Sequence, residues 1–183
     1  MSESFEWKVN WEINKYKADS IDIVKEQLIE PYEVIQREGN LLLHKGASAM
    51  WEYMIGNGTS SSGSSLAFFN NSNAYIGVGT STATALATQT DLQTGNLGTA
   101  SPYRAYGTME TGYPLHVDGS NSENAQISFK SIFDGSQAIF DWNEWGILNG
   151  TVSTSRVLNR KVDYVGTKQV GETWEFTINI TLS

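Results

Sequence analysis

The stretch FEWKVNWEIN, residues 5–14, alternates apolar and polar side chains without exception. A period of two residues is typical of a β-strand with one buried face. The last stretch of the chain, TWEFTINITL at residues 173–182, follows the same pattern with Trp, Phe, Ile, Ile and Leu on one face. The two ends of the sequence therefore predict two long amphipathic strands.

The sequence between these strands predicts helices only in its N-terminal third. Residues 19–30 carry apolar side chains at helical spacing and stop at Pro31. A second helix is predicted over 46–55, with an apolar face made of Ala47, Met50, Trp51 and Met54.

Short strands separated by turns account for most of the remaining residues. We expect them at 32–36, 40–44, 74–78, around 127–129, and at 137–148 and 156–165, with a long loop over 79–100. Asp134-Gly135 is a hairpin signal between two of these strands. The predicted fold is mainly β: an antiparallel β-sandwich or jelly roll with an N-terminal strand arm and one or two short helices.

The length of 183 residues suits one domain. Residues 1–57 are expected to form the strand arm and the short helices, 58–65 a Ser/Gly linker or loop, and 66–183 the β-sandwich. We expect the first and last parts to form one compact unit.

Charge and composition exclude several classes of protein. The net charge is −8, which argues against nucleic acid as a partner because phosphate binding needs a basic face. Only 17% of residues are charged, against about 25% in an average soluble protein, and the deficit lies in residues 53–128. The chain has no cysteine, so it has neither disulfides nor thiolate metal sites. No apolar run approaches the ~20 residues of a membrane span and no export signal is visible, so we expect no membrane partner and synthesis in the cytoplasm.

Two motifs raise the question of catalysis. Gly46-Ala-Ser48-Ala-Met50 resembles a hydrolase nucleophile elbow, but Met50 replaces the second glycine, so we expect Ser48 to begin a helix instead. In a strand Asp141 and Glu144 would point to opposite faces, so we expect that they cannot form a glycosidase pair by themselves. We expect Trp142 in the core and Glu144 to receive hydrogen bonds from backbone or arginine.

Three weaker motifs have structural explanations. The segment 118–124 is expected to be a polar turn rather than a calcium loop, and Gly77-Val-Gly79 a tight turn with positive φ. Arg156, Arg160 and Lys161 favour salt bridges or a subunit contact. We predict no catalytic, cofactor-binding or metal-binding residues, and hence no enzyme and no cofactor.

Two sets of aromatic residues are candidates for binding. Trp7, Val9 and Trp11 either complete the protein's own sheet or dock on a neighbouring subunit. Trp142 and Trp145, if exposed, are candidates for stacking against sugar rings of a host-surface carbohydrate.

An ordered series of short motifs runs through the chain from residue 5 to 183. It comprises Gly39-Asn-Leu-Leu-Leu43 with Gly46, Ala74-Tyr-Ile-Gly-Val-Gly79, Gln89-Thr-Asp-Leu92, Met109, Gly112-Tyr-Pro114, Trp142-Asn-Glu-Trp-Gly-Ile147, Leu158-Asn-Arg-Lys161, Gly166-Thr-Lys168 and Thr173-Trp174. Together these motifs resemble a group of virion structural proteins encoded by tailed bacteriophages. The resemblance implies a β-rich module, a place in the particle, and no catalysis.

These observations lead to one main hypothesis and one alternative. The main one is a capsid decoration (cement) protein, located in the virion, that binds the major capsid protein lattice as a homo-oligomer, with a trimer favoured by analogy. The alternative is a tail, neck or fibre component, with Trp142 and Trp145 contacting carbohydrate.

Overall fold

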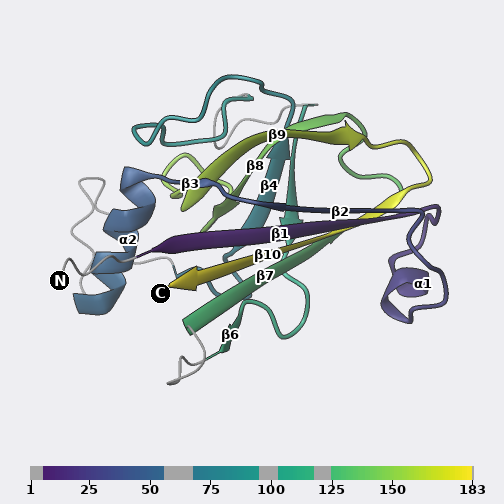
Figure 1. Ribbon diagram of the computed structural model, residues 1–183, viewed down its shortest axis with the longest axis horizontal. Coiled ribbons are helices and arrows are strands. Elements are labelled where there is room, and N and C mark those ends of the chain that lie inside the picture. Colours follow the sequence, from purple (N-terminus) through teal and green to yellow (C-terminus); the bar gives the residue numbers. More distant parts are fainter. Residues whose placement is uncertain (1–5, 56–67, 95–102, 118–124, 183) are drawn as a thin grey trace.

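Two antiparallel sheets of five strands each pack face to face in the computed structural model, which describes residues 6–55, 68–94, 103–117 and 125–182 (Figure 1). The strand order of the first sheet is β2 (Glu33–Glu38), β1 (Trp7–Tyr16), β10 (Thr173–Leu182), β7 (Ala125–Phe133), β6 (Leu115–Val117). The order of the second sheet is β3 (Leu41–Leu42), β9 (Asn159–Thr167), β8 (Asp141–Leu148), β4 (Tyr75–Gly79), β5 (Arg104–Thr108). The predicted mainly β fold with an antiparallel sandwich is confirmed.

Strands β1 and β10, the two amphipathic stretches of the sequence, lie side by side at the middle of the first sheet. They pair antiparallel from Trp7 opposite Leu182 to Tyr16 opposite Thr173. The other edge of β1 pairs with β2. Strand β1 is thus an interior strand of the protein's own sheet.

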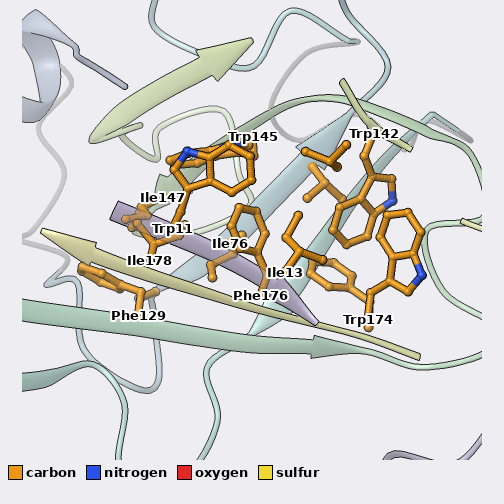
Figure 2. Packing of buried hydrophobic residues seen from close by; sticks show 14 of the residues in the cluster. Trp11, Ile13, Ile76, Phe129, Trp142, Trp145, Ile147, Trp174, Phe176 and Ile178 are labelled. Carbon is orange, nitrogen blue, oxygen red and sulfur yellow. The ribbon is translucent and has the colours of Figure 1, made fainter. Parts of the chain in front are cut away.

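The core between the sheets holds four tryptophans and three phenylalanines among aliphatic side chains (Figure 2). The ring of Trp11 meets Trp145 and Phe176 edge-on, at centroid distances of 5.6 and 5.9 Å. Trp142 and Trp174 make a second edge contact at 4.8 Å. Such pairs stabilise a core by about 0.5–1.5 kcal/mol beyond the burial of their area. The core therefore joins strands from the beginning and the end of the sequence.

The two sheets are also joined along one side. Just beyond β5, Met109 pairs with Ser131 of β7, and the Ser131 hydroxyl donates a hydrogen bond to the Gly107 carbonyl at 3.0 Å. A Cβ at Gly107 would lie 2.7 Å from the ring of Phe133, so glycine is required where the sheets meet.

The two helices lie at opposite ends of the sandwich (Figure 1). Helix α1 (Ile21–Lys25) is shorter than predicted: Ser20 caps its start, and Gln27 adopts a φ of 55° just after its end. Helix α2 (His44–Ile55) begins two residues earlier than predicted. The predicted linker at 58–65 lies outside the described residues.

The apolar face predicted for α2 is corrected by the structure. Trp51 and Met54 are 65% and 71% exposed, whereas Ala49 is fully buried. A Cβ on Gly46 would lie 2.1 Å from the Leu158 carbonyl oxygen. Small residues thus lie where the helix backbone comes closest to the rest of the sandwich, because larger side chains do not fit there. Met50, Glu52 and Tyr53 add contacts through their side chains.

The hairpin predicted at Asp134-Gly135 is wrong. Strand β7 belongs to the first sheet and β8 to the second, so the connection at Asp134-Gly135 crosses between the sheets. Gly135 packs so tightly on Asp19 that a Cβ would lie 2.7 Å from its carboxylate. A turn signal identifies a reversal of the chain but not the sheet that receives the next strand.

Candidate functional site

The loop formed by residues 80–94 lies on the outer face of the second sheet. On the inner face, Val78 and Trp145 are in the core. On the outer face, a Cβ at Gly77 or Gly146 would lie 2.9 or 3.3 Å from the Leu92 side chain. The two glycines leave the space that Leu92 fills.

The two glycines of Gly77-Val-Gly79 are therefore explained by the lack of space for a Cβ atom, and not by their backbone conformation. These residues belong to β4, and neither glycine has a positive φ, so the predicted tight turn is wrong. At the end of the strand, a Cβ on Gly79 would lie 2.8 Å from the Glu144 carboxylate.

Glu144 and Arg160 form an ion pair between the loop and the sheet. Both side chains are 0% exposed, and Arg160 Nε donates to the Glu144 carboxylate at 2.7 Å. The same carboxylate accepts the backbone N–H groups of Gln93 and Thr94 at 2.9 and 2.8 Å. Glu144 thus receives backbone and arginine hydrogen bonds, as the sequence predicted.

A second ion pair holds the loop a few residues earlier. Arg104 Nη1 donates to Asp91 at 3.0 Å, and Arg104 Nη2 donates to the Leu92 carbonyl at 2.5 Å. Arg104 also donates to the hydroxyl of Tyr106. Burial raises the pKa of the Tyr106 phenol above its usual value. The loop is thus held on the second sheet by contacts among five residues: Asp91, Leu92, Arg104, Glu144 and Arg160.

A cavity of about 520 Å³ lies between this loop and the edge formed by β3 and β9. We call it the basic cavity. Its lining consists of Gly39, Asn40, Leu41, Thr82, Thr84, Ala85, Arg160, Lys161 and Val162. It therefore combines hydroxyl, amide and basic groups beside an edge strand.

An apolar cavity of about 410 Å³ lies near α2, at the end of the sandwich where β1 begins and β10 ends. Met50 and Tyr53 of α2 line it together with Trp7, Phe69 and Phe129 from outside the helix. Its rim residues adjoin segments outside the described residues.

The end of the sandwich near α1 holds a group of buried polar side chains. Lys168 is 0% exposed and donates to the carbonyls of Asp134 and Gln137 at 2.6 and 3.0 Å. Burial lowers the pKa of Lys168 to about 8, although Asp134 and Glu172 oppose that shift. Burial alone would raise the pKa of Glu172, but hydrogen bonds from Lys17, the Gln169 amide and Tyr32 lower it below its usual value. These contacts hold the turn that follows β7 against the turn that precedes β10.

The predicted partner-docking strand is occupied within the protein. Val9 and Trp11 are 3% and 2% exposed, and Trp7 is half-buried with its Nε1 donating to Asn40 at 2.9 Å. Both edges of β1 are paired. These residues therefore complete the protein's own sheet, which is the first of the two alternatives that the sequence left open.

The predicted sugar-stacking residues are in the core. Trp142 and Trp145 are each 1% exposed, and their rings pack on other aromatic rings (Figure 2). A sugar needs an exposed ring face, so the structure removes the motivation for stacking at these two residues.

The other candidate residues from the sequence lie elsewhere in the fold. Ser48 is exposed inside α2 and does not begin it. Arg156 pairs with Glu52 at 2.9 Å, which fits the salt-bridging interpretation of the basic residues. The segment 118–124 lies outside the described residues. In the parts of the chain that the structure describes, no three His, Cys, Asp or Glu side chains gather as a metal site.

The basic cavity is the feature that sequence reasoning missed. Arg160 and Lys161 are adjacent in sequence, but Asn40 and Thr84 come from distant segments. The only available signal was the density of basic residues near 160 in an acidic chain.

Comparisons with known protein families, curated proteins and solved structures gave no match to this chain. No helix within the described ranges has the length and apolar character needed to cross a bilayer.

Proposed function

We propose that this protein is a structural component of a tailed-phage virion and decorates the capsid by binding the major capsid protein lattice. The motif series that runs from residue 5 to 183 supports a place in the particle. The β-sandwich is compatible with it, and many weak contacts to a repeating lattice add through multivalency. Assembly as a trimer is part of this proposal.

The observation that carries the docking role is the outward face of α2. Trp51 and Met54 are 65% and 71% exposed on neighbouring turns of that helix. Tryptophan is among the residues that contribute most to protein interfaces, and methionine adapts to irregular surfaces. Exposure of both on one helix favours a protein partner there, and the proposed partner is the capsid lattice.

The low charge of the middle of the chain also supports a particle protein. The exposed residues of the 80–94 loop include Thr82, Thr84 and Leu86, and its one charged side chain, Asp91, is held by Arg104. Contacts made by hydroxyl and apolar groups depend little on ionic strength, because salt screens only charges.

Purified protein added to phage particles that lack it would test the proposal. We expect co-sedimentation, on the order of hundreds of copies per particle, electron density on the shell, and a trimer in analytical ultracentrifugation. The double variant Trp51→Ser/Met54→Ser should fold normally and lose particle binding.

The matched control is Leu28→Ser, which removes a 69%-exposed apolar side chain near α1, at the other end of the molecule. It should bind particles like the wild type. Density on the tail or neck alone would replace decoration by the alternative role. Absence of binding to any part of the particle would overturn the virion assignment.

A further inference from the structure

The charge of the basic cavity differs from that of the whole protein. The chain has a net charge of −8, yet the two ionisable side chains among the described lining residues, Arg160 and Lys161, are both basic. The other polar side chains there are Asn40, Thr82 and Thr84. Such a lining favours a ligand with oxygen acceptors and negative charge.

The guanidinium of Arg160 has hydrogen-bonding capacity left over. Its Nε donates to Glu144 and its Nη1 to the Gln89 side chain at 2.9 Å, but Nη2 is buried without a partner. Asn40 Nδ2 is likewise buried without a partner, while Asn40 Oδ1 accepts from Trp7. A buried donor left unpaired is unfavourable, and more so when it is charged. Two lining residues therefore lack acceptors for their N–H groups.

The wall of the cavity is held in position before any ligand arrives. Gln89, which receives Arg160 Nη1, also accepts the Leu86 N–H at 2.9 Å and donates to the Thr84 carbonyl at 3.1 Å. These hydrogen bonds connect the loop, which forms one wall of the cavity, to Arg160 at the base of the cavity. A preorganised site loses less entropy on binding.

We propose that the basic cavity binds a carboxylate of a partner polypeptide, at its C-terminus or on an acidic side chain. Arg160 Nη2 and Asn40 Nδ2 are the donors left for the carboxylate oxygens, because Arg160 Nε and Nη1 are already bonded. Glu144 already neutralises Arg160, so the unbalanced charge that a ligand meets is Lys161, whose Nζ also donates to the Glu38 carbonyl at 3.2 Å. One carboxylate balances that charge, whereas the second charge of a phosphate dianion would have no basic partner among the described lining residues. A polypeptide is the source we favour, since the cavity borders the edge strand β3, where an extended chain can lie alongside.

This inference goes beyond the proposed function and does not depend on it. The site would bind its carboxylate on the isolated protein, whereas the decoration role requires particles and the α2 face. Failure of one assay therefore leaves the other result intact.

Titration of the ¹⁵N-labelled protein with N-acetylglycine, followed by NMR, tests the site. We expect saturable shifts of the backbone amides of Thr82, Thr84 and Lys161. N-acetylglycinamide, which lacks the carboxylate, should cause no such shifts, and inorganic phosphate should bind more weakly than N-acetylglycine.

Two variants with the same change of charge locate the binding. Lys161→Gln should weaken N-acetylglycine binding roughly three- to fivefold, the effect of losing one partly exposed charge pair. Lys8→Gln removes an exposed charge from the first sheet and should titrate like the wild type. Thr84→Val should also weaken binding without affecting the fold, because Thr84 is exposed.

Three results would overturn the proposal. The first is equal shifts from the acid and the amide. The second is tighter binding of phosphate, and the third is equal affinities in Lys161→Gln and Lys8→Gln. Each would show that the basic cavity does not recognise a carboxylate.

Discussion

Glu144 shows how one buried carboxylate can organise a loop. It accepts two backbone N–H groups from the loop and neutralises Arg160 beneath it, in a place where neither side chain meets solvent. Burying such a pair contributes little net stability, but removing one partner leaves a buried charge uncompensated.

Glu144→Gln is therefore expected to destabilise the protein by about 3–5 kcal/mol, since the amide keeps the shape and loses the charge. Urea unfolding followed by tryptophan fluorescence measures this difference. Glu6→Gln, which breaks an exposed pair with Lys8, should change stability by less than about 0.5 kcal/mol. Equal stabilities of the two variants would contradict the role given to Glu144.

Gly46 occupies a position where helix propensity and packing disagree. Alanine is favoured over glycine inside a helix by about 1 kcal/mol. A Cβ at this position would nonetheless overlap the Leu158 carbonyl. We expect Gly46→Ala to destabilise the protein by about 1–3 kcal/mol, the usual range for overpacking.

The control for Gly46→Ala is Ser48→Ala, at an exposed position of the same helix. It should be neutral or slightly stabilising. Thermal unfolding by circular dichroism measures both variants. An increase in stability for Gly46→Ala would show that α2 can move away from Leu158, which lies just before β9.

At the scale of elements, β1 is the strand on which the first sheet depends. It has a paired neighbour on each side, and its inward side chains reach the second sheet through the contact of Trp11 with Trp145. Deleting an edge strand would leave the other pairs intact, but deleting β1 separates β2 from β10 and opens the core.

Removal of residues 1–14 should therefore abolish cooperative folding. We expect loss of the near-ultraviolet circular dichroism of the tryptophans and aggregation of the product. Lys8→Ala, at an outward position of the same strand, should stay folded with little change in stability. A soluble truncated protein with a sharp unfolding transition would show that these residues are a dispensable arm.

At the scale of the whole molecule, buried ionisable groups link stability to pH. Burial lowers the pKa of Lys168 to about 8, from 10.5 in an unfolded chain. Between these values the unfolded state binds more protons, so stability rises with pH. Burial and the hydrogen bond to Glu172 raise the pKa of Tyr32 to about 12. Above pH 10 the folded state binds more protons at Tyr32, so this residue makes stability fall.

Stability should accordingly increase from pH 8 to 9.5, with a contribution from Lys168 on the order of 1–2 kcal/mol. Urea unfolding at several pH values measures the slope. In Lys168→Met the slope over this interval should be smaller, whatever the absolute stability of the variant. An identical slope in both proteins would mean that Lys168 has an ordinary pKa.

Much of the fold follows from local sequence. The alternation in residues 5–14 and 173–182 identified two strands, because a strand with one buried face must repeat every two residues. The apolar environment of Trp142 and the hydrogen bonds to Glu144 were also predictable, since a carboxylate among aromatic residues needs donors.

What local sequence cannot determine is the pairing of distant segments. The neighbours of β1, the crossing of the chain at Asp134-Gly135 and the outward face of α2 depend on which surfaces meet. The basic cavity depends most of all on how distant segments pair, because Asn40, Thr84 and Arg160 are far apart in the chain. The period of a sequence specifies which side of an element is apolar, but only the packed sheets decide what covers that side and which polar groups gather beside it.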